Sequence, residues 1–252
     1  MNNSNQKDHF RIVDYIMQKI MENEFVSGQR IPSLNQLSQL FEVNRNVTIQ
    51  ALTRLENLGW ISPIQGKGYF VNKRPTKVMD VLSKFNRFTD TMTRTGEKPN
   101  SRLLDWTLAE PMLSEQEALN ITSKDKVYRL EVLRFLGPSP ITILTASFPE
   151  KIVPGMEKYL GNFYSLHGIL MEHYGFNPTI RYSTIEAKMP TEQDAKWLEI
   201  PEDIPVFWKK SLNLHPNGTP VEMVVGRIRS DRYQITVDFE NLEKDNLIKK
   251  LK

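Results

Sequence analysis

The strongest constraint on the fold lies between residues 10 and 71, where three short helical patterns are followed directly by two β-like runs. In each helical segment the apolar side chains recur every three or four residues, which predicts amphipathic helices. The three apolar stripes are Phe10, Val13, Ile16, Met17, Ile20 and Met21; Leu34, Leu37, Leu40 and Phe41; and Val47, Ala51, Leu52, Leu55 and Leu58.

Local signals place the ends of these elements. Ser33 and Asn44 are good N-caps for the second and third helices, and Gly59 is a typical helix stop. Residues 60–64 and 69–71 then form two short β-like runs around a glycine-rich tip, which predicts a hairpin. Three helices and a two-stranded wing in this order predict a winged helix-turn-helix.

The face of the third helix opposite its apolar stripe has the chemistry of a DNA reader. A 100° wheel places Asn46, Ile49, Gln50 and Thr53 there, with Arg45 at the N-terminal edge. Asn and Gln pair with adenine, Arg with guanine or phosphate, and Ile with the thymine methyl group. An ordinary solvated face is the alternative. The capped preceding helix, the tight turn and the local excess of basic residues favour DNA.

The tip of the wing supports the same interpretation. Gly66 and Gly68 allow the backbone to approach the minor groove or the phosphates, and Lys67 adds a positive charge between them. A hairpin without this role needs only one glycine.

The charge of the chain is unevenly distributed. The formal charge is only +3, but residues 1–75 carry nine basic and six acidic side chains, so the whole excess lies in this first part. A length of 252 residues suggests two domains, here a polyanion-binding module and a neutral one.

The absence of cysteine excludes disulfides and thiolate metal sites. With no signal peptide or apolar run of about 20 residues, we expect a soluble cytoplasmic protein without membrane contact.

The rest of the chain mixes strand and helix signals, so the predicted fold class is α+β, with a mixed, largely antiparallel sheet after the winged helix-turn-helix. We expect domains at 1–75 and 89–245 and a linker at 76–88, where Val78, Val81, Leu82 and Phe85 keep a helical period. The predicted helices are Ser165–Tyr174 and Thr191–Leu198. The predicted strands are Val127–Phe135, Ile141–Phe148, Thr179–Lys188, Val206–Leu214, Val221–Arg229 and Gln234–Phe239.

From Ile31-Pro32-Ser33 through Phe41-Glu42-Val43-Asn44-Arg45 to Gln65-Gly66-Lys67-Gly68-Tyr69-Phe70-Val71, the sequence closely resembles the DNA-binding domain of the GntR regulators. Many members carry arginine at the positions of Asn35 and Ile49, so we expect operator contacts that are altered or weakened. The candidate DNA contacts are Ser33, Asn35, Asn44, Arg45, Asn46, Ile49, Gln50, Gly66, Lys67 and Gly68.

From about Ser83 to Asn241 the sequence resembles the UTRA effector domain of the HutC branch, whose fold is similar to chorismate lyase. The resemblance rests on residues 127–134, 140–149, 165–167 and 229–233. Within the branch, the chain most resembles the phosphonate-utilisation regulators, through Phe41-Glu42-Val43-Asn44-Arg45, Gly59-Trp60, Leu166-His167 and Leu198-Glu199-Ile200-Pro201.

A ligand site is expected where Ser165 opens a helix, because the amide groups of Leu166 and His167 and the helix dipole favour an anion. The resemblance adds Arg134 and Arg181 as anion-binding arginines, and Arg229 and Tyr233 in a closing motif. The alternative is that Ser165 is only a cap and the arginines are surface charges. An amino-sugar phosphate is less expected, because amino-sugar sensors of the family tend to have an additional arginine near the position of Val132 and an acidic residue near that of Leu144, and this chain has neither.

The resemblance implies a dimeric repressor that binds double-stranded operator DNA and is released by a small anion, namely a phosphonate, phosphate ester or carboxylate. We expect no cofactor and no metal. An enzyme that uses the lyase-like fold is one alternative, although the four histidines are dispersed and no nucleophile or metalloprotease motif is visible. A regulator with altered or weakened DNA binding is the other.

Overall fold

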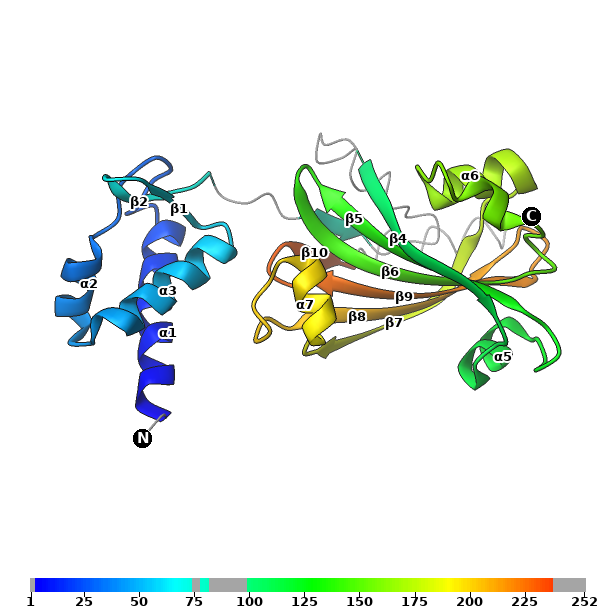
Figure 1. Ribbon diagram of the computed structural model, residues 1–252, viewed down its shortest axis with the longest axis horizontal. Coiled ribbons are helices and arrows are strands. Elements are labelled where there is room, and N and C mark those ends of the chain that lie inside the picture. Colours follow the sequence, from blue (N-terminus) through cyan, green and yellow to red (C-terminus); the bar gives the residue numbers. More distant parts are fainter. Residues whose placement is uncertain (1–2, 74–77, 82–98, 238–252) are drawn as a thin grey trace. The chain divides into compact units, whose positions relative to one another are not determined.

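The computed structural model describes residues 3–73, 78–81 and 99–237 of the chain (Figure 1). The chain divides into two compact units, Met1–Thr76 and Lys77–Lys252. Residues 74–77, 82–98 and 238–252 lie outside the described residues. They include most of the predicted linker 76–88, both ends of the predicted domain 89–245 and the end of the predicted strand Gln234–Phe239.

The first unit contains the predicted helices and hairpin. The elements are α1 (Asn3–Met21), α2 (Leu34–Phe41), α3 (Arg45–Asn57), β1 (Ile61–Ile64) and β2 (Gly68–Val71). All five contribute to one buried cluster, in which Ile16, Leu37, Leu52 and Ile61 are completely buried. The apolar stripes therefore build a single core, and the polar face of each helix is left outside.

Side-chain caps fix the turn between α2 and α3. The Ser33 Oγ accepts a hydrogen bond from the Gln36 amide at 3.3 Å, and the Gln36 side chain accepts one from the Ser33 amide at 2.8 Å. The Asn44 side chain accepts from the Val47 amide at 3.0 Å. Both predicted N-caps are confirmed. A hydroxyl pair, Ser38 and Thr48 at 2.9 Å, also joins the two helices.

The second unit is built on a six-stranded antiparallel sheet with the order β4-β5-β6-β9-β8-β7. This confirms the α+β fold class and the largely antiparallel sheet. The strands are β4 (Pro99–Ala109), β5 (Val127–Leu136), β6 (Ser139–Pro149), β7 (Thr179–Lys188), β8 (Val206–Leu214) and β9 (Pro220–Arg229).

Helices cover both faces of this sheet (Figure 1). One face packs against α6 (Leu166–Tyr174) and the 3₁₀ turn η1 (Met156–Tyr159), and receives alternate β5 residues such as Leu130 and Val132. The other face packs against α5 (Leu113–Leu119) and α7 (Glu192–Leu198), and receives Leu133. The side on which a strand residue points therefore decides which helix it meets.

A smaller sheet corrects one prediction. Strand β3 (Val78–Val81) pairs in parallel with β10 (Tyr233–Thr236), so the helical interpretation of Val78 and Val81 is wrong. Val78 is completely buried beside Tyr233 and Ile228. Two valines three residues apart fit a helix locally, but pairing with a distant strand decides their conformation.

Candidate functional site

The outward face of α3 has the composition expected from the sequence. Arg45, Asn46, Ile49 and Gln50 are exposed, whereas the stripe beginning at Val47 is buried. Among the residues that the structure describes, the side chains of Arg45, Asn46 and Gln50 make no hydrogen bond. Their polar groups are therefore available to base edges and phosphates, although the contacts themselves stay predictions.

The remaining candidate DNA contacts lie at the two helix caps, on α2 and in the wing. The Ser33 and Asn44 oxygens are occupied by capping, so these residues position the helices, while Asn35 lies exposed on α2. At the wing, Gly66 and Gly68 have φ angles of 73° and 101°, a conformation that favours glycine. Lys67 is exposed between them.

In the second unit, Arg134 lies on the sheet face covered by α6. It follows Leu130 and Val132 in the alternation of β5, and its side chain interacts electrostatically with Glu222 and Tyr233. Burial lowers the pKa of Arg134, and the charges of Glu222 and Tyr233 act against that effect. The structure thus brings Arg134 and Tyr233 together.

A buried acid that the sequence analysis did not single out completes this group. Glu222 is 1% exposed and accepts a 2.6 Å hydrogen bond from the Asn213 Nδ2 atom. Burial raises its pKa to about 7, while the Asn213 bond and the Arg134 charge lower it. The Asn213 Oδ1 atom is buried without a hydrogen-bond partner among the described residues. The pair therefore offers acceptor oxygens inside the domain.

The N-terminus of α6 is built as expected, on the same side of the sheet as Arg134. The Ser165 Oγ accepts from the Gly168 amide at 3.3 Å. The Leu166 side chain is buried in the core beneath the helix, and His167 is half-buried. The amides of Leu166 and His167 belong to the first turn of the helix, where the helix dipole favours an anion.

Two predicted effector residues are placed elsewhere. Arg229 lies on the face covered by α7, where its guanidinium binds Asp231 at 2.7 and 3.1 Å and the Leu198 carbonyl at 3.1 Å. These bonds anchor the end of α7. Arg181 is exposed at a bulge in β7, which forms one edge of the sheet. Neither residue is brought beside Arg134.

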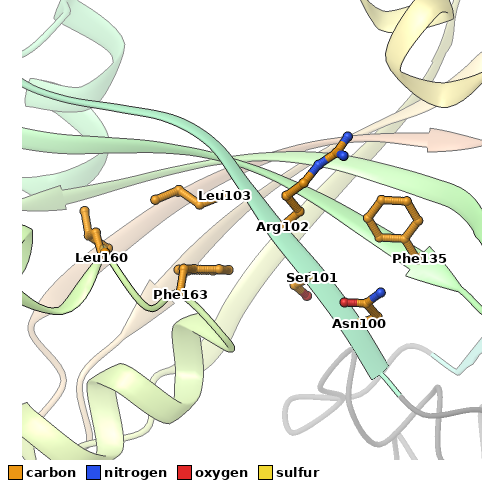
Figure 2. Close-up of a pocket in the computed structure, with 8 residues that line it drawn as sticks. Asn100, Ser101, Arg102, Leu103, Phe135, Leu160 and Phe163 are labelled. Atoms are coloured by element: carbon orange, nitrogen blue, oxygen red, sulfur yellow. The ribbon is translucent and has the colours of Figure 1, made fainter.

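A pocket of about 520 Å³ opens beside the first residues of β4 (Figure 2). Leu160 and Phe163, from the segment that leads into α6, lie on one side of the strand, and Arg102 and Phe135 lie on the other. Ser101, which lines the pocket, is opposite Arg134 in the strand register. The predicted effector residues do not line the pocket itself, so only Ser101 relates it to Arg134.

In the described part of the chain, no three histidine or acidic side chains gather as a metal site. No described helix is long and apolar enough to span a bilayer.

Comparisons with known families agree with both units. Residues 10–71 match the bacterial regulatory proteins of the gntR family, and residues 94–234 match the UTRA domain. The chain belongs to the GntR family. A GntR-type helix-turn-helix joined to a UTRA domain makes it a DNA-binding transcriptional regulator, in which the UTRA domain receives a small-molecule effector.

Its relatives are also regulators. The chain is 25% identical to the transcriptional repressor NagR of Bacillus subtilis, over 89% of this chain and 91% of the relative. It is 27% identical to the probable transcriptional regulator PhnF of Escherichia coli, over 88% and 91%. The crystal structure of PhnF from Mycobacterium smegmatis shares the fold, with a TM-score of 0.61 and 20% identity over 86% of this chain and 95% of that one. The relatives support a regulator rather than an enzyme.

Proposed function

We propose that this GntR regulator is a homodimeric repressor of the HutC type that leaves a palindromic operator when a small anion binds its UTRA domain. The exposed, unpaired polar face of α3 supports the DNA-reading role. A dimer offers two such faces to two half-sites, so the operator repeats the two-fold symmetry of the protein. Its site of action is the bacterial chromosome, in the cytoplasm.

The chemistry of the buried sheet face supports an anionic effector. Arg134 provides a cation there, and the first turn of α6 provides amide donors. Glu222 and Asn213 add acceptors to the same face, which suit an amino or hydroxyl group. The effector is therefore an anion that also carries a hydrogen-bond donor.

Three anion classes fit this description: phosphonates, phosphate esters and carboxylates. The resemblance to phosphonate-utilisation regulators places phosphonates first. Phosphate esters and carboxylates belong in the same test, because a buried cation and helix amides bind these anions by the same chemistry.

Release follows from a difference in affinity between two states. The effector binds more tightly to a dimer geometry in which the two α3 helices no longer match the half-site spacing. A ligand that binds both geometries equally would not release DNA.

The test is a fluorescence-anisotropy titration of the full chain with a promoter duplex from the regulator's own gene neighbourhood, at low salt. It is repeated with 2-aminoethylphosphonate, methylphosphonate, glucose 6-phosphate and acetate. We expect binding without additive and release by the phosphonate that carries an amino group. Failure to bind the duplex at low salt would contradict the repressor, and release by none of the compounds would contradict the anion proposal.

The alternative of weakened operator binding has its own supporting observation. Asn35 on α2 and Ile49 on α3 are both exposed, and neither carries a charge. The same titration tests this alternative. If the affinity for the promoter duplex is no greater than the affinity for an unrelated duplex, the protein does not bind its operator specifically.

A further inference from the structure

The segment before α2 runs beside the wing. The Gly28 amide donates to the Val71 carbonyl at 2.8 Å, and the Ile31 amide donates to the Tyr69 carbonyl at 3.0 Å. Arg30 thereby forms an antiparallel bridge with Phe70. Ile31 is buried in the core of the unit, whereas the neighbouring Arg30 is exposed.

The Arg30 side chain lies along β2 toward the tip of the wing. A Cβ atom on Gly68 would lie 3.1 Å from the Arg30 Nε atom and 3.4 Å from Nη2, so the guanidinium occupies the space beside the glycine. Lys67, the charged residue of the tip, is the direct neighbour of Gly68. The absence of a side chain at Gly68 therefore leaves room for the Arg30 guanidinium beside the residue that follows Lys67.

This guanidinium has no partner among the described residues, by either hydrogen bond or ion pair. Between Gly28 and Arg74 the chain has only two acidic residues, Glu42 and Glu56, against six basic ones. The backbone hydrogen bonds already hold the segment to β2, so the charge is not needed to fix the wing. A planar, exposed guanidinium without a partner among the described residues is well suited to donate two parallel hydrogen bonds to a phosphate.

We propose that Arg30 is a further DNA-contacting residue, which binds a backbone phosphate beside the one contacted by Lys67. The inference rests on the DNA binding of the family and is independent of the effector. Because a phosphate contact carries no base information, Arg30 contributes to affinity and to its salt dependence but not to sequence preference.

The experiment measures DNA affinity of the full chain by fluorescence anisotropy across a salt series, on two duplexes of unrelated sequence. For Arg30→Ala we expect about a tenfold loss of affinity on both duplexes. The slope of log K against log salt should shrink by about 0.9, the value for one lost phosphate contact on B-DNA.

Two further variants separate charge from structure. Arg30→Lys keeps the charge and should keep the slope, with part of the affinity lost. Lys124→Ala removes one exposed cation from the second unit and should change neither quantity.

A stably folded Arg30→Ala variant with the wild-type slope would overturn the proposal, whether or not its affinity falls. If Arg30→Ala melts early, Arg30→Gln is compared with Arg30→Lys, and equal slopes would overturn it. Failure of the wild-type chain to bind either duplex would instead contradict DNA binding as a whole.

Discussion

Glu222 links the candidate effector face to a measurable pH effect. Its pKa rises from the usual 4.5 to about 7 in the folded chain because the carboxyl is buried. The folded state therefore binds this proton more tightly than the unfolded state. The associated stability is fully present below about pH 4.5 and is lost as the pH rises through about 7.

We expect the free energy of unfolding of the second unit to fall between pH 5 and about 7, by as much as about 3 kcal/mol. Glu222→Gln keeps an acceptor for Asn213 but cannot ionise, so this dependence should disappear. Urea unfolding at a series of pH values measures the difference. Glu115, whose pKa is lowered by Arg129 and Ser147 against its burial, acts below this range. Identical pH profiles for wild type and variant would contradict the assignment.

Arg134 should be needed for the response to the effector and not for DNA binding. We expect Arg134→Ala to bind the promoter duplex like the wild type but not to be released by the active phosphonate, because the cation that binds the anion is gone. Anisotropy with and without the compound gives both readouts. Arg134→Lys, which retains the charge, should keep part of the response. Release of Arg134→Ala at the wild-type concentration would show that the anion binds elsewhere.

The sequence predicted one kind of site residue better than the other. The reading face of α3 follows from the helical period alone, so Arg45 and Gln50 could be placed on it directly. Glu222 and Asn213 face each other across the β8–β9 hairpin, and only the strand register brings them together. The family resemblance suggests Arg229 as an effector residue, but the sequence does not reveal that its side chain binds Asp231 and the end of α7 on the other face of the sheet.

At the level of the elements, α3 carries the sharpest prediction about DNA. Arg45→Ala should weaken binding by about 1 to 3 kcal/mol, because Arg45 is exposed at the start of the reading helix and has no partner among the residues that the structure describes. Arg54→Ala is the matched control. It removes the same charge from the same helix. The Arg54 Cζ atom lies 4.9 Å from the centroid of the Phe10 ring, so Arg54 packs on α1 and is not part of the reading face.

Anisotropy titrations at one salt concentration compare the two variants, and thermal melts confirm that both are folded. Equal losses for Arg45→Ala and Arg54→Ala would mean that net charge, and not the reading face, determines affinity.

Strands β3 and β4 could not be predicted from the sequence, because in each of them the local pattern of side chains is misleading. In β4, Leu103 pairs with Val132 and Asp105 pairs with the next residue of β5, Glu131, so Leu104 is an extra residue without a partner in the register. This bulge breaks the alternation that identifies a strand. In β3 the conformation depends on a partner strand some 150 residues away in sequence. Elements whose signal is local, such as α2 with its capping box, were predicted correctly.

At the level of the whole molecule, the excess positive charge lies in the part of the chain that binds DNA, and the effector-binding part is neutral. The excess of +3 lies in the first 75 residues, which contain the reading helix and the wing, whereas the remaining residues are neutral. A basic module attracts DNA over a long range, and a neutral sensor domain adds no repulsion. In the proposed release, the DNA site and the effector site are linked by a coupling free energy.

The coupling between DNA binding and effector binding can be measured in both directions. If saturating effector raises the dissociation constant for the promoter duplex by some factor, saturating duplex must raise that for the effector by the same factor. We expect a factor of about 5 to 150, which corresponds to roughly 1 to 3 kcal/mol of coupling free energy. Anisotropy gives the first value and isothermal calorimetry, with and without duplex, gives the second. A factor near one in both directions would show that DNA and effector bind independently, which contradicts release by the effector.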